Sequence, residues 1–244
     1  MMDLRGLHLG TAGWQLPKAL NTPAEEPVLV RYARHFNAVE INSTFYRPHQ
    51  PRTFAKWAAS VPDDFRFAVK MHRSVTHERR LSDIRPAQVF LEMVSALGPK
   101  LGPVLIQLPP SLVWSTEAED FLSALREVYD GAVVLEARHP SWAAPDAVNA
   151  LKANTISGVA ADPPLLYTDL RPSGYPHLVY FRLHGSPRVY WSSYSDDFLH
   201  PLSEQVCDLL KAGEEVWVVF DNTAAGAGAT DALRLKDLIV ERLA

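Results

Sequence analysis

The chain has 244 residues, of which 47% are hydrophobic, and its formal net charge at pH 7 is −4. This length suits one (β/α)8 domain, for which about 250 residues is typical, and we expect a single domain over residues 1–244. The acidic balance excludes bulk, non-specific nucleic-acid binding, which needs a broadly basic surface, but it is compatible with a local basic pocket.

We expect neither a membrane span nor a disulfide. No run approaches the ~20 apolar residues of a membrane-spanning helix, and residues 1–5 lack the apolar stretch of a signal peptide. The one cysteine, Cys207, lies among apolar residues and is expected to be a small buried side chain. We therefore expect a cytoplasmic protein.

Eight short, apolar, β-prone runs recur along the chain, and each leads into a polar or ionisable cluster. They are residues 7–9, 38–39, 65–69, 104–106, 133–135, 156–160, 179–181 and 216–220. A buried parallel strand has a continuous apolar sequence of this kind.

Amphipathic segments between these runs predict helices. The apolar spacing predicts them over residues 23–35, 51–60, 85–97, 116–129, 145–152, 201–211 and 230–243. Thr22 is the expected N-cap of the first helix, and residues 116–119 resemble a capping box.

The alternation of strand and helix predicts parallel pairing with right-handed crossovers, and hence an α/β fold of the TIM (β/α)8 type. Residues 162–177 contain four prolines, so we expect the barrel to be irregular between its sixth and seventh strands. An open doubly wound sheet is the alternative. It needs a glycine-rich fingerprint after the first strand, which residues 10–14 do not provide.

The candidate functional residues follow the predicted strands, because the active site of such a barrel is built where its strands end. The second run leads to Glu40 and Asn42, which either orient a substrate or form a cap or buried polar bracket. The third run ends at Lys70, which should point into the mouth or be paired. A lysine there can bind an anion or, if desolvated, act as a base or Schiff-base nucleophile. We favour anion binding.

Lys70 begins the most basic stretch of the chain, residues 70–80. His72 in this stretch is a candidate for substrate binding. Its spacing of five residues from His77 is not a standard ligand spacing for a metal site on a helix.

The fifth run leads to Glu136 and Arg138, which alternation places on one side of the strand. They form either a structural ion pair or a functional pair. In the functional interpretation, Glu136 is a general base or ligand and Arg138 holds a substrate carboxylate or phosphate.

The seventh run leads to Arg182 and His184, which share a face. Tyr190, Trp191 and Tyr194 follow in a serine-containing loop, and they either pack in the core or, as we favour, line the rim of a pocket.

After the eighth run, Asp221 and Asn222 precede a segment of small residues that leads into a helix. This segment is either a flexible loop or a phosphate site, because barrels commonly hold a phosphate there.

Seven motifs, in order along nearly the whole chain, resemble the DUF72 family, also called YecE-like. They are residues 39–46, 67–70, 76–77, 107–110, 136–142, 180–185 and 221–223. The resemblance implies a TIM barrel and no established activity. The last motif usually has two asparagines, whereas this chain has Asp221 and Asn222. The added carboxylate either favours metal binding or pairs with Arg182 or Lys70.

The leading hypothesis is an enzyme that acts on a small phosphorylated or carboxylated anion, with no metal or cofactor required. The predicted catalytic residues are Glu136, His184 and Glu40. The predicted substrate-binding residues are Lys70, Arg138, Arg182, Asn42, His72, Tyr190 and Asn222. Several cations at one mouth of an acidic protein would attract anions there.

Two other hypotheses stay open. One is a metal-dependent hydrolase or isomerase, with Glu40, Glu136, His184 and Asp221 as ligands of a divalent cation, although nearby cations oppose the metal. The other is a non-enzymatic module for a nucleotide or nucleic-acid end, because aromatics beside cations suit stacking and phosphate contact.

Overall fold

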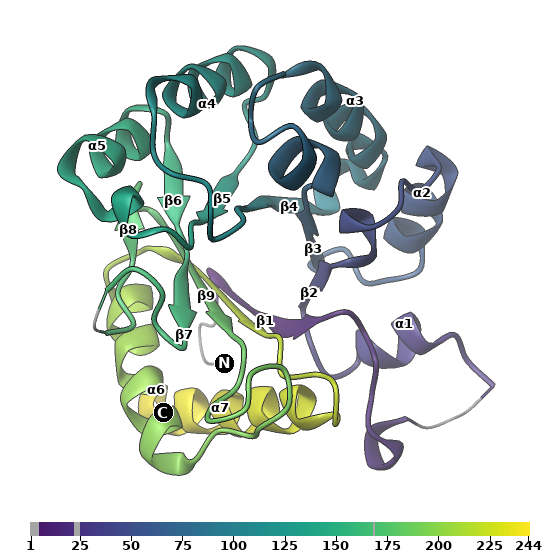
Figure 1. The fold of residues 1–244 in the computed structure, drawn as a ribbon. Helices are drawn as coiled ribbons and strands as arrows, with labels where there is room; N and C mark the ends of the chain where they lie inside the picture. Colours follow the sequence, from purple (N-terminus) through teal and green to yellow (C-terminus); the bar gives the residue numbers. More distant parts are fainter. Residues whose placement is uncertain (1–4, 22–24, 168) are drawn as a thin grey trace.

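The structure is a computed structural model that describes residues 5–21, 25–167 and 169–244. Over these residues the strands form one 10-stranded sheet that curves into a barrel, with the helices packed around its outside (Figure 1). The predicted TIM-barrel fold is confirmed.

The strands match the eight predicted runs, except that the sixth run is split in two and one further strand of two residues, at 173–174, was not predicted. They are β1 (Leu7–Ala12), β2 (Ala38–Ile41), β3 (Arg66–Lys70), β4 (Leu101–Gln107), β5 (Val133–Glu136), β6 (Ile156–Gly158), β7 (Ala160–Asp162), β8 (Ser173–Gly174), β9 (Leu178–Leu183) and β10 (Glu215–Phe220). The order in the sheet is β7-β9-β10-β1-β2-β3-β4-β5-β6-β8. Every neighbouring pair is parallel except β6 and β8.

Strand β7, at one end of this order, meets β6, which is next to the other end, at a break in the sixth predicted strand that we call the seam. Val159 alone separates β6, which pairs with β5, from β7, which pairs with β9. The Val159 N–H donates to the Leu135 carbonyl at 2.9 Å, so the chain itself closes the ring. In the described residues between β7 and β9 there is no crossover helix, as the prolines predicted.

The helices lie close to their predicted positions. They are α1 (Val28–Tyr32), α2 (Pro51–Ala59), α3 (Arg85–Val94), α4 (Thr116–Val128), α5 (Pro145–Ala153), α6 (Asp196–Lys211) and α7 (Ala227–Leu243). Short helical turns occur at Lys18–Leu20, Ser43–Phe45, Ser74–Glu78, Ser95–Lys100 and Pro140–Ala143.

Several helix starts differ from the prediction. Helix α1 is shorter than predicted, and the expected cap Thr22 lies outside the described residues. The cap of α4 is Ser115, whose hydroxyl accepts from the Ala118 N–H at 3.4 Å. Helix α6 begins at Asp196, before Pro201, because acidic residues favour the first turn of a helix and Arg234 of α7 binds Asp196 at 2.9 Å.

The barrel interior is a packed core beneath the mouth. Its buried residues are Ala12, Ala38, Ala68, Leu105, Val134, Leu178, Tyr180, Trp217 and Val219. The rings of Tyr180 and Trp217 are stacked, with centroids 5.9 Å apart. A Cβ at position 102 would lie 2.6 Å from the Trp217 ring, so only glycine fits there. The filled interior forms the floor on which the polar strand ends gather.

Candidate active site at the mouth of the barrel

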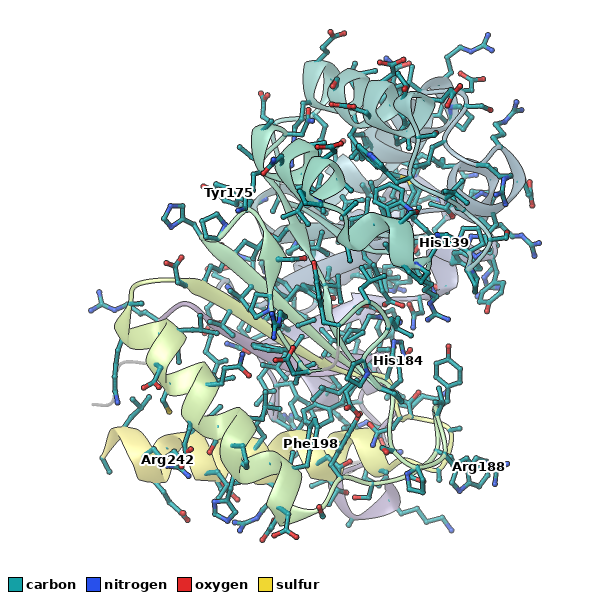
Figure 2. All side chains as sticks on the ribbon, turned by 60° about the vertical axis from the view of Figure 1, so that its left-hand side comes forward. His139, Tyr175, His184, Arg188, Phe198 and Arg242 are labelled. Atoms are coloured by element: carbon teal, nitrogen blue, oxygen red, sulfur yellow. The ribbon has the colours of Figure 1, made fainter. Side chains whose placement is uncertain are left out.

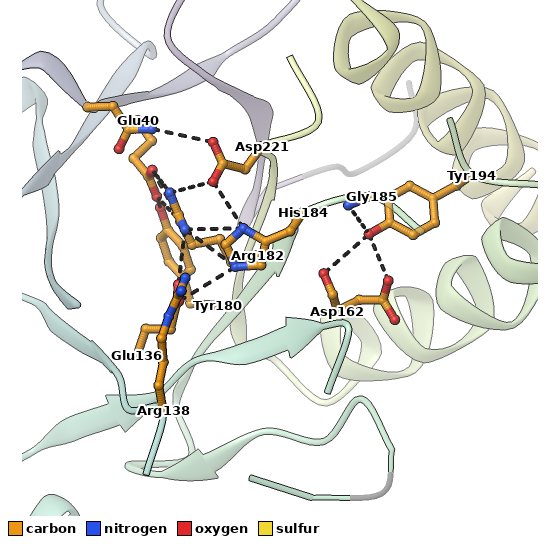
Figure 3. Close-up of polar contacts among 11 residues, drawn as sticks. Glu40, Glu136, Arg138, Asp162, Tyr180, Arg182, His184, Gly185, Tyr194 and Asp221 are labelled. Carbon is orange, nitrogen blue, oxygen red and sulfur yellow. Dashed lines mark hydrogen bonds and ion pairs between the residues drawn. The ribbon is translucent and has the colours of Figure 1, made fainter. Parts of the chain in front are cut away.

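Arg182, near the end of β9, is the centre of a buried charged cluster (Figure 3). Its Nε and Nη2 donate to Glu40, with the Nη2–Oε1 distance 2.8 Å, and its Nη1 donates to Oε2 of Glu136 at 3.1 Å. Nη2 also lies 2.9 Å from Oδ2 of Asp221. The three carboxylates come from β2, β5 and the end of β10. They meet because the strands of a parallel barrel all end at the same mouth.

Tyr180 supports this cluster from below. It lies two residues before Arg182 on the same face of β9, and its hydroxyl donates to Oε2 of Glu40 at 2.8 Å. Burial, together with the Glu40 charge, raises the pKa of Tyr180 well above its usual value. The phenol therefore stays protonated and holds Glu40 in place.

His184 links two of the carboxylates and reaches the mouth at the end of β9 (Figure 2). Its Nδ1 lies 3.0 Å from Oδ2 of Asp221, and its Nε2 lies 3.6 Å from Oε1 of Glu136. Burial of the ring opposes protonation, but the contacts with Asp221 and Glu136 outweigh it and raise the pKa of His184. The ring is thus poised to carry a proton near neutral pH.

Glu136 and Asp221 are held in their charged forms. Burial favours the neutral acids, but the positive charge of Arg182, with the bonds to His184, overcomes it. The pKa of Glu136 is well below its usual value, and that of Asp221 is also lowered. Arg138 adds to this effect at Glu136, since its Nε and Nη2 lie 3.0 and 2.7 Å from Oε1. The Glu136–Arg138 pair is therefore an ion pair in this structure.

Lys70, at the end of β3, is a shielded cation with no such partner. It is 9% exposed, and its Nζ lies 4.4 Å from the centre of the Phe45 ring. Among the described residues, no hydrogen bond or ion pair of its ammonium is found. Burial first, and the Arg182 charge second, lower the pKa of Lys70 to about 8. The alternative that Lys70 is paired is therefore wrong.

Two further side chains face this part of the mouth. His77 packs against the Phe45 ring that Lys70 also contacts, with the ring centroids of His77 and Phe45 4.9 Å apart. Burial and the charges of Lys70, Arg73 and Arg138 lower the pKa of His77. Tyr190 has φ 66°, in the left-handed region that a tyrosine seldom adopts, and its ring meets the edge of His184 at a centroid distance of 5.5 Å. His77 was not a predicted site residue, although it lies in one of the family motifs.

The structure brings together most of the predicted site residues. Asn42 joins the cluster, with its Nδ2 3.5 Å from Oδ1 of Asp221. Arg182 is 1% exposed and is held by three carboxylates, which does not favour the predicted contact between Arg182 and a substrate anion. Arg182 instead positions Glu40, Glu136 and Asp221.

Three predicted residues lie elsewhere. His72 bonds to Ser74 and lines a separate cavity of about 490 Å³ beside α3. Asn222 is buried, and its Nδ2 donates to the Ser192 carbonyl and to Asp231. Placing Tyr194 on the pocket rim was wrong, because it is 7% exposed. Its hydroxyl accepts from the Gly185 N–H at 2.7 Å and donates to Asp162 at 2.8 Å (Figure 3).

Metal binding and membrane insertion find no support in the residues described. No group of three or more histidine, cysteine, aspartate or glutamate side chains in this part of the chain is arranged to hold a metal ion. The four ligands of the metal hypothesis do converge, but around the guanidinium of Arg182. No helix of the described chain has the length and apolar character needed to cross a bilayer.

The fold and this cluster define a TIM-barrel protein with a charged site at the carboxyl ends of its strands. The family model described as "Protein of unknown function DUF72" matches residues 8–243, and the chain belongs to this family. The resemblance seen in the motifs is thus confirmed.

Known proteins place the chain among barrels of this family. It is 31% identical over 146 residues to the UPF0759 protein YecE of Escherichia coli K12, an alignment that covers 56% of this chain and 50%, or about half, of YecE. A crystal structure of a DUF72 protein from Thermotoga maritima has TM-score 0.79 and 27% identity, and covers 96% of this chain and 99% of that one. A xylose isomerase-like TIM barrel protein from Mycobacterium smegmatis, solved with magnesium, shares the fold at TM-score 0.57 and 13% identity over 97% and 98% of the chains.

Proposed function

We propose that the protein is an enzyme that binds a small phosphorylated or carboxylated anion at the mouth of the barrel and acts on it by acid–base chemistry. The observation that carries this proposal is Lys70, a cation that is largely shielded from water and has no counter-ion among the described residues. Removing an ammonium from water without pairing it is costly, so an anion arriving at this position would gain a strong partner.

Arg138 is the second anion-binding group. Its side chain is 21% exposed, so part of the guanidinium faces the mouth although it also binds Glu136. Lys70 ends β3 and Arg138 follows β5, and β4 lies between these two strands in the sheet; the positive charges of both side chains lower the pKa of His77. Two cations that share a neighbourhood provide a place for one small anion.

His184 is the acid–base group of this proposal, and Glu136 supports it. His184 carries a proton held between Asp221 and Glu136, which suits a general acid. Glu136 is a weak base while Arg182 and Arg138 hold its charge, so it acts mainly by orienting His184. Glu40, which accepts from Arg182 and Tyr180, is a positioning residue.

The metal-dependent alternative is less favoured. The magnesium of the Mycobacterium smegmatis protein belongs to that structure. In this chain a divalent cation would have to displace Arg182, a guanidinium held by three carboxylates. Such multiple charge-assisted bonds are strong in a buried site.

A thermal-shift measurement with inorganic phosphate tests the proposal. We expect phosphate to raise the Tm of the wild type, and Lys70→Met or Arg138→Gln to abolish this shift, because each removes one of the two cations. Arg171→Gln is the matched control, since Arg171 holds Asp169 two residues before it, as Arg138 holds Glu136, but on the exposed surface. If no small anion raises the Tm, or if Arg171→Gln removes the shift equally, the proposal fails.

A further inference from the structure

The Lys70 amine can act as a nucleophile as well as an anion-binding charge. Resting on the proposed function, we infer that the substrate is a small oxo acid, and that the Lys70 amine forms an imine with its aldehyde or keto group while Arg138 holds its acidic end. The geometry behind this inference is the position of Lys70 at a barrel mouth where every nearby carboxylate is already taken.

Arg182 is what leaves Lys70 without a counter-ion. Its guanidinium holds Glu40, Glu136 and Asp221 at distances between 2.8 and 3.1 Å. The negative charges of the same three carboxylates raise the pKa of Lys70, but by less than burial and Arg182 lower it. An ion pair with any of them would lock the ammonium in its charged form, and no such pair is found in the described chain.

The surroundings of Lys70 favour the neutral amine in two ways. The side chain is nine-tenths shielded and its Nζ rests over the Phe45 ring, so solvation of the charge is poor. The Arg182 guanidinium adds a like charge nearby. Desolvation and a neighbouring cation are the two means by which proteins activate a lysine as a nucleophile.

The chemical effect is large at neutral pH. With a pKa of about 8, roughly one Lys70 side chain in ten carries a free amine at pH 7. A solvent-exposed lysine with an ordinary pKa near 10.4 has roughly one in several thousand. Lys70 is therefore expected to react with a carbonyl group far faster than surface lysines do.

The reaction balances without a further reactant. The nitrogen lone pair attacks the carbonyl carbon, a C–N bond forms, and one N–H proton passes to the former carbonyl oxygen to give a carbinolamine. This oxygen takes a second proton from solvent and leaves as water while the nitrogen lone pair forms the C=N bond, and the iminium then returns one proton to solvent. The product is an imine, and when protonated it keeps the positive charge among the three carboxylates.

Reductive trapping with glyoxylate, the smallest aldehyde acid, tests this inference. The full-length protein is incubated with glyoxylate and cyanoborohydride near pH 7, where hydride transfer to an imine leaves a stable carboxymethyl group on the lysine nitrogen. Peptide mapping by mass spectrometry then locates the modified residue. We expect modification at Lys70 to exceed that at each surface lysine at least tenfold, and to vanish when cyanoborohydride is omitted.

Two variants sharpen the experiment. Lys70→Arg keeps a positive charge but has no primary amine, so trapping at this position must vanish. Lys211→Arg is the matched control, because Lys211 is 62% exposed and should contribute little to trapping. Inorganic phosphate competes for the same cations and should slow trapping at Lys70 without slowing trapping at surface lysines.

The outcomes separate this inference from the proposed function. If phosphate raises the Tm but Lys70 is trapped no faster than surface lysines, the imine is overturned and the anion site stands. If Lys70 is trapped selectively but phosphate neither raises the Tm nor slows trapping, the amine is reactive but the anion site fails, and the oxo-acid assignment fails with it. If neither effect occurs, both are overturned.

Discussion

Lys70 and Arg182 show how one buried cation determines the properties of another. Arg182 forms the ion pairs with the three carboxylates, so Lys70 has none. Desolvation and the repulsion from Arg182 therefore disfavour the charged form of Lys70. A group that must stay in a disfavoured charge state lowers the free energy of unfolding. Such costs are typical of sites selected for binding or chemistry.

Lys70→Met should therefore stabilise the protein. The pKa of Lys70 falls from 10.5 to about 8 on folding, so its charge is disfavoured throughout the range below pH 8. We expect the variant to gain about 1–3 kcal/mol in free energy of unfolding at pH 7, measured by urea denaturation.

The pH dependence provides a second check on Lys70. Between pH 8 and 10.5 the unfolded chain binds more protons at this residue than the folded chain, so its contribution to wild-type stability rises with pH. Lys70→Met should lack this rise. Lys211→Met, at an exposed site, should stay within about 0.5 kcal/mol of the wild type. A destabilised Lys70→Met variant would contradict the account.

For the single residues of the site, the sequence predicted which side chains lie at the mouth better than it predicted their ion-pair partners. The strand-end pattern identified Glu40, Lys70, Glu136, Arg182 and His184 as mouth residues. It could not show which cation takes the carboxylates, because that depends on which strand ends face one another across the barrel. Arg182 does so because β9 brings it within reach of side chains from both β2 and β5.

Among the elements, the loop from Gly185 to Tyr194 packs against His184 at the mouth through Tyr190. Arg188 lies at the outer edge of this loop (Figure 2), and its guanidinium is 4.4 Å from the centre of the Trp191 ring. The loop is fixed at its far end by the Tyr194 hydroxyl, which joins the Gly185 N–H to the Asp162 carboxylate. Tyr190 is thereby held against His184 in its left-handed conformation.

Tyr194→Phe should loosen this loop. The change leaves the buried Gly185 N–H without its acceptor and the buried Asp162 carboxylate without its donor, and we expect a loss of about 1–3 kcal/mol in stability. Amide hydrogen exchange over residues 185–194 should also become faster. Tyr46→Phe is the control, because Tyr46 is 70% exposed. Unchanged exchange in the loop would show that Tyr194 is not what fixes it.

The sequence predicted the existence of this loop but not its internal arrangement. Aromatic residues among serines indicated a rim, and Tyr190 lies at the mouth as expected. Tyr194 packs inward instead, because the buried Gly185 N–H and Asp162 need a hydroxyl between them. Such pairing of polar groups distant in sequence is not visible in a local pattern.

At the scale of the whole barrel, the Arg182 cluster joins side chains from both sides of the seam. Glu136 lies on β5, before the seam, and Arg182 lies on β9, after it. The ion pair therefore spans the place where the backbone ladder is interrupted at Val159. The four prolines in residues 162–177 predicted irregularity after the sixth strand, whereas the break at Val159 lies within the predicted sixth strand and was not predicted.

Arg182→Met should reverse the response of the protein to acid. In the wild type, the pKa values of Glu136 and Asp221 are lowered on folding, so their contribution to stability is present above about pH 4 and is lost as the pH falls through the folded values. Without the guanidinium, Glu40 keeps only the Tyr180 hydroxyl, and buried carboxylates favour protonation. The variant should lose about 3–5 kcal/mol at pH 7 and regain part of it as the pH falls toward 5.

Urea denaturation between pH 4 and 7 measures this reversal. Arg182→Lys is the companion variant, because it keeps a charge and should keep the acid sensitivity of the wild type with lower stability. If Arg182→Met loses stability on acidification as the wild type does, the cluster does not close the barrel through its charges.

Because Arg182 lies late in the chain, it is synthesised after the carboxylates of Glu40 and Glu136 that it binds. Glu40 precedes Arg182 by 142 residues and Glu136 precedes it by 46. At about 5–20 residues per second, a ribosome would expose Glu40 for several seconds before its guanidinium partner is made. During that interval the strands of the first half carry carboxylates that must stay in water. The mouth of the barrel is therefore completed only when β9 emerges, and the charged site and the closed ring are formed in the same event.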